Sequence, residues 1–195
     1  MADAFNQKLN SIMTLERNTP RVSFIDCHVY YLTDDKRGQF SVIVEPKLEG
    51  RFEKWNNNNG WRMQSTADTG GRTVLTIKEE DDSSDDSVID ITGNAAKETI
   101  CVTKNEVAQA FSHFSHHWTR KQSLICDLQG AYSEYEHLFK FTDPVVHYHN
   151  ARRDSKKGKF GKTDLGQKGI DSFFKSHKCN KLCDLVTKGF MTTSR

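Results

Sequence analysis

The sequence predicts an α+β fold, because stretches with helical spacing and stretches rich in β-branched and aromatic residues follow one another without a regular alternation. Apolar residues recur with the helical period in 4–15, in 107–118 and in 170–185. The runs 21–32 and 39–46 are instead rich in Val, Ile, Tyr and Phe, which favours strands. A chain of 195 residues can bury one sizeable core or form a compact two-lobed domain.

The first half of the chain predicts a helix, a hairpin and a long insertion, in that order. Pro20 ends the first helix, and the turn-forming run TDDKRG separates the two β-rich stretches, which therefore predict a β-hairpin. From residue 62 to 99 the sequence turns polar and then acidic, with KEEDDSSDD at 78–86. This composition predicts a surface insertion with one short strand at RTVLTI, 72–77.

The second half opens with a predicted amphipathic helix that begins near Glu106. Its apolar residues follow the helical period: Val107, Ala110, Phe111, Phe114 and Trp118. The apolar run SLIC then predicts a short strand that ends just before Asp127, and the segment 170–186 predicts one closing helix.

Composition narrows the classes of function. The formal net charge is +2, so no strong overall field indicates a nucleic-acid partner, although the run 151–162 is basic. No apolar run approaches the length of a membrane helix, and the N-terminus lacks the pattern of a secretory signal. With five cysteines, we therefore expect an intracellular, cytoplasmic protein with reduced thiols and no membrane partner. Cysteines close together in such a protein are more often metal ligands or catalytic groups than disulfides.

The segment HKCNKLC brings three potential metal ligands within seven residues: His177, Cys179 and Cys183. Zinc in a structural site takes four tetrahedral nitrogen or sulfur ligands, so one ligand is still needed. The candidates lie on the helix that begins near Glu106: His113, His116 and His117. Of these, His113 borders the buried face. The alternative interpretation is a pair of buried free cysteines beside a surface histidine.

Two aspartates and a glycine-rich stretch are further candidates. Asp127 follows a buried strand and Asp143 precedes a proline, so the pair could serve as base and metal ligand in phosphoryl transfer. Equally, Asp127 could cap a turn and Asp143 could fix a bend before the proline. The glycines of GKTDLGQKG could expose backbone amides to an anion or form a plain surface turn: Gly161, Gly166 and Gly169.

Five motifs, QAFSHFSHHWT, ICDLQG, FTDPVVH, GKTDLGQKG and HKCNKLC, occur in one order along the chain, and VEPKLEGRFEKWNNNNG precedes them. In this order and content the sequence resembles the alpha-kinases, the atypical protein kinases that include myosin heavy chain kinase and elongation-factor-2 kinase. The resemblance implies a kinase-like, two-lobed fold in which most of the N-terminal lobe is missing and zinc stabilises the C-terminal lobe. It divides the chain into an N-lobe remnant of helix and hairpin, a hinge, the polar insertion and the C-lobe: 1–44, 45–61, 62–99 and 100–188.

The resemblance also implies roles for single residues. It makes His113 the fourth zinc ligand and Asp127 the catalytic aspartate. It assigns Gln129 and Asp143 to magnesium and phosphate, and Glu45 to the hinge that binds adenine. It places the three glycines in a loop that binds the peptide substrate, although Thr163 and Asp164 stand where that loop has glycine and asparagine.

We therefore expect a serine/threonine protein kinase that uses ATP, Mg²⁺ and a structural Zn²⁺. The family anchors the ATP phosphates with a lysine on a strand before the hinge, and residues 1–44 show no convincing counterpart. The alternative is a catalytically inactive, zinc-stabilised interaction module.

Overall fold

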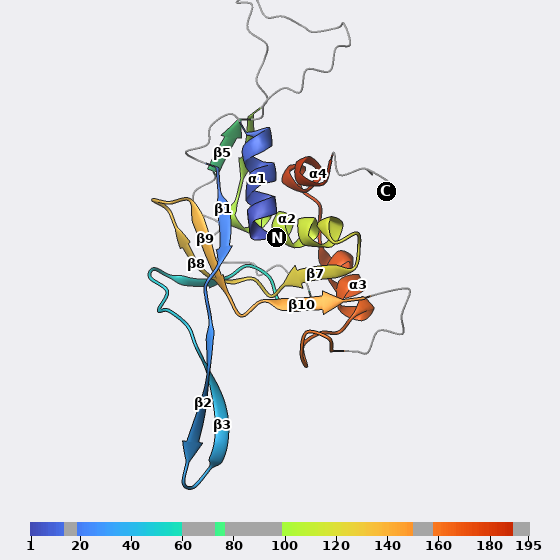
Figure 1. Cartoon of the computed structure of the whole chain (residues 1–195). Coiled ribbons are helices and arrows are strands. Elements are labelled where there is room, and N and C mark those ends of the chain that lie inside the picture. The colour runs from blue at the N-terminus through green and yellow to red at the C-terminus, as the bar shows by residue number, and fades with distance from the viewer. Residues whose placement is uncertain (14–18, 60–72, 77–98, 150–157, 189–195) are drawn as a thin grey trace, which may run out of the picture.

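A computed structural model describes residues 1–13, 19–59, 73–76, 99–149 and 158–188 (Figure 1). The elements are α1 (Ala2–Ile12), β1 (Arg21–Phe24), β2 (His28–Asp34), β3 (Gly38–Val44), β4 (Phe52–Lys54), β5 (Thr73–Thr76), β6 (Thr99–Val102), α2 (Lys104–Trp118), β7 (Ser123–Cys126), β8 (Gln129–Ser133), β9 (Leu138–Thr142), β10 (Val145–Tyr148), α3 (Gln167–Ser176) and α4 (Lys181–Thr187). The mixed order of helices and strands confirms the predicted α+β class.

A four-stranded sheet forms the centre of the molecule. Its strand order is β1-β9-β8-β4, with β1 parallel to β9 and the other pairs antiparallel. A second, two-stranded antiparallel sheet pairs β7 with β10. In the chain, β7 directly precedes β8 and β10 directly follows β9. In Figure 1, α1, α2 and α4 lie together beside the central sheet, and α3 lies beside β7 and β10.

Aromatic rings fill the space between the helices and the central sheet. Phe5 of α1 meets Phe111 and Phe114 of α2 edge to face, at centroid distances of 5.3 Å. Trp55 contacts Phe139 and Phe141 of β9 in the same way. Large buried rings supply most of the apolar area that drives such packing. The N-terminal helix therefore belongs to the same core as α2 and β9.

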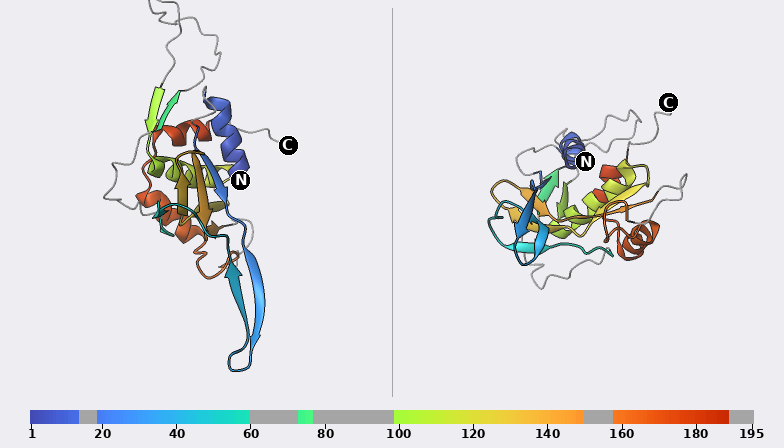
Figure 2. Two further views of the ribbon diagram at one scale, coloured as in Figure 1. Left: turned by 90° about the vertical axis from the view of Figure 1, so that its left-hand side faces the viewer. Right: turned by 60° about the horizontal axis from the view of Figure 1, so that its bottom comes forward.

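The predicted hairpin forms, but it begins later than expected. The first part of the predicted strand is β1, which leaves the hairpin and pairs with β9. The hairpin itself consists of β2 and β3, and it projects away from the body of the molecule in Figure 1 and in the left view of Figure 2. Both of its strands are almost entirely exposed.

The helix predicted to start at Glu106 begins two residues earlier, at Lys104, because a capping box defines its first turn. The Glu106 backbone N–H donates to Thr103 Oγ1 at 3.2 Å, and the Thr103 N–H donates to the Glu106 carboxylate at 2.7 Å. These two bonds satisfy backbone donors that a helix start otherwise leaves unpaired.

The predicted single closing helix is wrong: the structure has two helices, α3 and α4, with residues 177–180 between them. Asn180 caps α4 by accepting a hydrogen bond from the Cys183 backbone N–H at 2.9 Å. Cys179 therefore precedes α4, and only Cys183 of the two cysteines is helical.

The predicted short strand inside the polar insertion is confirmed as β5, which pairs with β6. Residues 62–72 and 77–98 of the segment predicted as insertion, including the acidic run 78–86, lie outside the described residues. Within the part of the chain that the structure describes, no helix has the length and apolar character needed to cross a membrane.

Candidate functional site

The two candidate aspartates lie where the central sheet gives way to the β7–β10 pair. The facing pairs on either side of this break are Cys126 with Val145 and Gln129 with Thr142. Asp127 and Asp143 are the first residues of the two short connections between these pairs. Both connections span the gap between the same two antiparallel strand pairs, so they run next to each other. The topology therefore brings the two aspartates into the same region.

Both aspartates have left-handed backbone conformations. The φ angle is 58° at Asp127 and 45° at Asp143. Residues other than glycine rarely adopt this region, and aspartate and asparagine tolerate it best. Strained backbone of this kind often marks functional sites, where the surrounding structure holds it in place.

Lys54 of β4 contacts Asp127, and sequence reasoning did not select it. Its Nζ lies 2.6 Å from Asp127 Oδ1, and its side chain is about one-third exposed, at 34%. Lys54 faces Gln129 in the β4–β8 register, so the lysine, the amide and the carboxylate occupy neighbouring positions. The sequence placed Lys54 only in the predicted hinge, 45–61, and nothing local connects it to Asp127.

Glu45 is brought to the same region by Thr142. The Thr142 hydroxyl donates to Glu45 Oε2 at 2.5 Å, and Thr142 directly precedes Asp143. The structure therefore joins the segment predicted as hinge to the start of the β9–β10 connection.

A buried asparagine, Asn56, links the turn at Asp127 to α2. Asn56 is fully buried, donates to Ser112 Oγ on α2 at 3.1 Å and accepts from the Leu128 N–H at 2.9 Å. The backbone N–H of Trp55 donates to Leu128 O at 2.9 Å. These bonds fix the residue that follows Asp127, so they limit the freedom of the strained turn.

Gly130 of β8 and Cys126 of β7 lie in the strands next to the site. A Cβ on Gly130 would lie 2.0 Å from Lys140 O, so the glycine lets β8 and β9 approach. Burial raises the pKa of the Cys126 thiol to about 12, with the neighbouring Asp127 charge acting in the same direction. A protonated thiol of this kind is a poor nucleophile.

The predicted glycine-rich loop is organised by Asp164, which is buried. Its carboxylate accepts hydrogen bonds from the N–H groups of Tyr148, Phe160 and Gly166 at 2.9–3.1 Å. This internal carboxylate uses amides that an anion would otherwise need, which disfavours the anion-cradle interpretation of the loop. Gly161 has φ 99° in a turn of this loop.

The other two glycines of the motif lie at α3. Gly166, with φ 60°, is the N-cap of the helix. Gly169 lies within the helix, and a Cβ there would come 2.3 Å from the ring of His147. His147 is fully buried, accepts from the Leu165 N–H at 3.2 Å and donates from Nε2 to Asn58 O at 2.7 Å. Gly169 therefore allows α3 to pack on β10.

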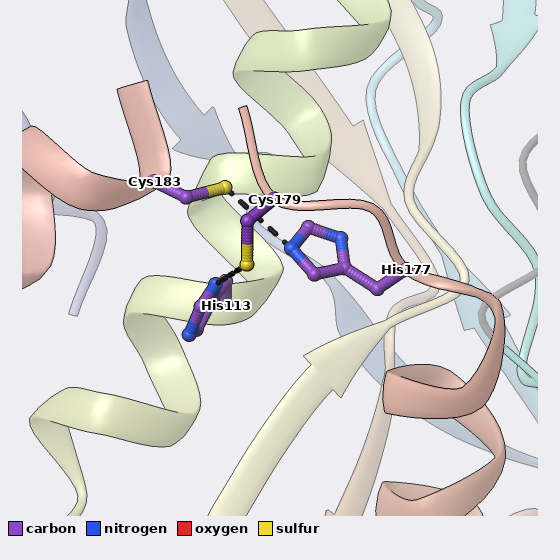
Figure 3. Close-up of side chains that lie close together, drawn as sticks. All are labelled: His113, His177, Cys179 and Cys183. Carbon is purple, nitrogen blue, oxygen red and sulfur yellow. Dashed lines mark hydrogen bonds between the residues drawn. The ribbon is translucent and has the colours of Figure 1, made fainter. Parts of the chain in front are cut away.

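The four predicted zinc ligands come together, as Figure 3 shows. Their ligand atoms all lie within 4.8 Å of one another, and they come from α2, the 177–180 connection and α4. His113 Nδ1 is 3.6 Å from Cys179 Sγ, and His177 Nε2 is 3.5 Å from Cys183 Sγ. A tetrahedral zinc ion with ordinary bond lengths separates its sulfur and nitrogen ligands by about 3.6 Å. The cluster therefore fits zinc in ligand type and in spacing.

The titration behaviour of the cluster suits metal ligation. Burial, with a contribution from His113, lowers the pKa of His177 to about 4, so its imidazole is neutral at pH 7. Burial also lowers the pKa of His113 below its usual value. Burial raises the pKa of the Cys183 thiol to about 12. A bound cation would supply the charge that a buried thiolate requires.

Comparison with known proteins gives the family. The profile of the alpha-kinase family matches residues 1–78 and 83–183. This chain belongs to the alpha-kinase family. It is 27% identical over 166 residues to myosin heavy chain kinase C of Dictyostelium discoideum, covering 85% of this chain and 15% of that protein. It is 27% identical over 150 residues to eukaryotic elongation factor 2 kinase of Rattus norvegicus, covering 76% of this chain and 14% of that protein.

Solved alpha-kinase domains share the fold. The domain of myosin-II heavy chain kinase A, in a crystal structure with a phosphorylated aspartate, superposes with a TM-score of 0.57 at 26% identity, covering 95% of this chain and 51% of that one. A complex of the same domain with AMP gives a TM-score of 0.54 at 25% identity, covering 95% of this chain and 54% of that one. This chain therefore has a kinase-like alpha-kinase fold and spans about half the length of those solved chains.

Proposed function

We propose that this chain carries the phosphate-transfer site of a protein kinase that moves the γ-phosphoryl group of ATP to serine or threonine in a protein. The observation that carries the proposal is the group formed by Asp127, Lys54, Gln129 and Asp143 at the break between the two sheets. A carboxylate paired with a cation and flanked by a second carboxylate is the chemistry that phosphoryl transfer requires. Family membership supports the same reaction.

Each side chain of the group has a proposed role. Asp127 accepts the proton of the substrate hydroxyl, and its strained backbone holds the carboxylate in one direction. Lys54 places a positive charge beside Asp127, where phosphate oxygens would lie. Asp143 and Gln129 would hold Mg²⁺, which neutralises the charge of the phosphates when bound. Glu45, at the end of β3, would lie on the adenine side of the nucleotide.

The glycine-rich loop is proposed to contact the protein substrate. It connects β10 to α3 and has its own internal carboxylate, Asp164, so its backbone is shaped before any ligand binds. Gly161 lies in the loop and Gly166 ends it, while Gly169 serves the packing of α3. A peptide rather than a phosphate suits a loop whose amides are already used.

A transfer assay with radiolabelled ATP, Mg²⁺ and a threonine-containing peptide tests the proposal. The expected result is phosphate transfer by the unmodified chain and loss of at least about 10²-fold in Asp127→Asn. The matched control is Asp3→Asn on α1, an exposed aspartate away from the site. No transfer by a folded, unmodified chain would contradict the kinase proposal for this chain.

That negative result would favour the second candidate, an inactive zinc-stabilised interaction module. One observation in the sequence supports it: residues 1–44 show no convincing counterpart of the lysine that anchors the ATP phosphates in the family. Lys54 lies on β4, inside the segment predicted as hinge, 45–61, and not on a strand before it, so it is a separate group.

We also propose that His113, His177, Cys179 and Cys183 bind one structural Zn²⁺. The ligand types and the sulfur–nitrogen distances support this. Elemental analysis should find about one zinc per folded chain, and Cys179→Ser should lose it. Folded protein free of zinc and of any other bound metal would contradict this proposal.

A further inference from the structure

The two ring nitrogens of His177 have different neighbours. Nε2 lies 3.5 Å from Cys183 Sγ, inside the cluster of candidate zinc ligands. Nδ1 lies 3.0 Å from Oε1 of Gln109, on the opposite side of the ring. Gln109 is a buried residue of α2, with 5% of its surface exposed, and stands one helical turn before His113.

We propose that Gln109 is a positioning residue for zinc: it selects the tautomer of His177 and orients its ring so that Nε2 faces the metal. The inference rests on the proposed zinc site and extends it to a residue that ligates nothing. Gln109 was not singled out by the sequence, because its position on the buried face of α2 resembles that of an ordinary core residue.

The chemistry follows from what a glutamine can accept and donate. The amide oxygen of Gln109 is an acceptor only, so the nitrogen that faces it must carry a hydrogen. A neutral imidazole carries one N–H, so a hydrogen on Nδ1 leaves the lone pair on Nε2. That lone pair then points toward Cys183 and the centre of the cluster. A histidine held in this way does not have to change tautomer when the metal binds.

Burial makes the contact difficult to replace with water. Gln109 is almost fully enclosed, and its Nε2 has no hydrogen-bond partner within the described residues. A buried amide with an unsatisfied donor lowers stability, so a merely structural role would be better served by an apolar side chain. A glutamine at this position supplies a hydrogen-bond acceptor for His177, and a leucine would not.

The aromatic neighbours of His177 do not settle which nitrogen faces the cluster. Phe173 stacks on its ring at 4.9 Å with planes 17° apart, and Phe174 meets it edge-on at 6.1 Å. These contacts fix the plane of the ring, yet a half-turn of the ring keeps that plane while exchanging the ring atoms on its two sides. Gln109 distinguishes the two orientations.

The test measures zinc affinity by competition with a chelator of known affinity, for the full chain and three variants. Gln109→Leu removes the acceptor at similar volume, and Gln109→Glu keeps an acceptor. Ser112→Ala is the matched control, because Ser112 is a fully buried residue of α2 whose hydrogen bond goes to Asn56 and not to the cluster. We expect Gln109→Leu to weaken zinc binding about 10- to 100-fold, and Gln109→Glu and Ser112→Ala to bind as the unmodified chain does.

Cobalt replacement gives a second readout, since the visible spectrum of Co²⁺ reports its ligands. Gln109→Leu should change the band shape, while Ser112→Ala should not. Equal affinities and equal spectra for the unmodified chain and Gln109→Leu would overturn the inference and leave the zinc site standing. An unmodified chain without zinc affinity would instead defeat the zinc proposal, and this inference with it.

If Gln109→Leu does not fold, Gln109→Glu carries the test. Its carboxylate accepts from Nδ1 at least as strongly as the amide does, so zinc affinity should be kept or raised. A loss of 10-fold or more in Gln109→Glu would overturn the inference.

Discussion

At the scale of single residues, backbone conformation sets Asp127 and Asp143 apart from the other aspartates of the described chain. Each follows the last residue of a strand and turns the chain through a left-handed conformation. A short acidic side chain meets two demands at such a position: it tolerates positive φ, and it carries the charge that the proposed reaction uses. Sequence reasoning reached both aspartates from their places beside a strand and a proline, but it could not see that they share a backbone state.

This backbone state predicts different stabilities for two variants of Asp127. Asparagine tolerates the left-handed region and alanine does not, so Asp127→Ala should be less stable than Asp127→Asn by about 1 kcal/mol in the free energy of unfolding. Both variants remove the negative charge that pairs with Lys54, so the loss of the ion pair is common to the two. Urea denaturation of the two proteins checks the difference, and equal stabilities would show that the turn relaxes.

Lys54 should matter for activity far more than for stability. Its side chain is partly exposed, so losing the ion pair with Asp127 should change stability little. If it faces phosphate oxygens, Lys54→Met should lower the rate of transfer by about 10²-fold or more. Lys140→Met is the control, because Lys140 forms an exposed ion pair with Glu136 away from the site. Equal transfer rates for the two variants would remove Lys54 from the proposed mechanism.

At the scale of elements, the contact between α3 and β10 depends on a missing side chain. A Cβ at Gly169 would overlap the ring of His147, whose two nitrogens are both hydrogen-bonded. The glycine costs some helix stability, and close packing of the helix on the strand offsets that cost. The resemblance placed Gly169 in a substrate loop, whereas its visible role is this packing.

Gly169→Ala should therefore destabilise the protein by about 2 kcal/mol through overpacking. In a His147→Ala background the obstacle is gone, and the same substitution should become neutral or stabilise by up to about 1 kcal/mol, because alanine favours helix. A double-mutant cycle of unfolding free energies measures both values. An equal cost in both backgrounds would mean that His147 is not the obstacle.

The elements were predictable where the signal is local. The apolar period of α2 and the turn-forming run of the β2–β3 hairpin act within a few residues, so type and approximate position were correct. The partner of β1 was not predictable, because its pairing with β9 joins segments that are distant in sequence. The same limit hid Lys54 and Gln109, whose contacts with Asp127 and His177 are made across the fold. Three members of the His/Cys cluster were predictable because they lie within seven residues, whereas the choice of His113 as the fourth came from the resemblance.

The β2–β3 hairpin presents an exposed apolar face. The exposed apolar residues on that face of the hairpin are Tyr30, Leu32, Phe40 and Val44. Because the hairpin projects from the core, Leu32→Thr combined with Phe40→Thr should change the unfolding free energy by less than about 0.5 kcal/mol. For comparison, Phe111→Ala in the core should cost about 3–5 kcal/mol. Thermal or urea unfolding checks both, and a large loss in the hairpin variant would show that the hairpin packs on the body.

At the scale of the whole molecule, the cluster of candidate zinc ligands connects separate parts of the chain. His113 comes from the middle of α2, His177 and Cys179 from the connection after α3, and Cys183 from α4. Two hydrogen bonds also link the 177–180 connection to α2: the Asn180 side chain donates to Glu106 O at 3.0 Å, and His177 Nδ1 lies 3.0 Å from Gln109 Oε1. A metal held by all four ligands would fix the relative positions of the three helices.

Acid should weaken this connection even without metal. The pKa of His177 is lowered to about 4 by burial and by His113, and burial lowers the pKa of His113 as well. An unfolded chain takes up these protons near pH 6.5, so it binds more protons than the folded chain between about pH 4 and 6.5. Stability of the zinc-free protein should therefore fall as the pH falls through that window, and His177→Ala should flatten the decline. An equally steep decline in the variant would assign it to other groups.

Removal of zinc at pH 7 should lower the melting temperature of the whole domain. A ligand present at about one hundred times its dissociation constant stabilises the folded state by about 2.7 kcal/mol, which corresponds to about 5–10 °C for a chain of this size. The measurement compares melting with and without a chelator. Cys101→Ser, at an exposed cysteine outside the cluster, should melt as the unmodified chain does in both conditions. Cys183→Ser should melt at a low temperature in both conditions, because it lacks a ligand.

At pH 5 the difference in melting temperature produced by the chelator should shrink, since protons compete with zinc for the imidazoles and thiols. A melting temperature that the chelator leaves unchanged at pH 7, in protein that carries zinc, would show that the metal does not hold the helices together.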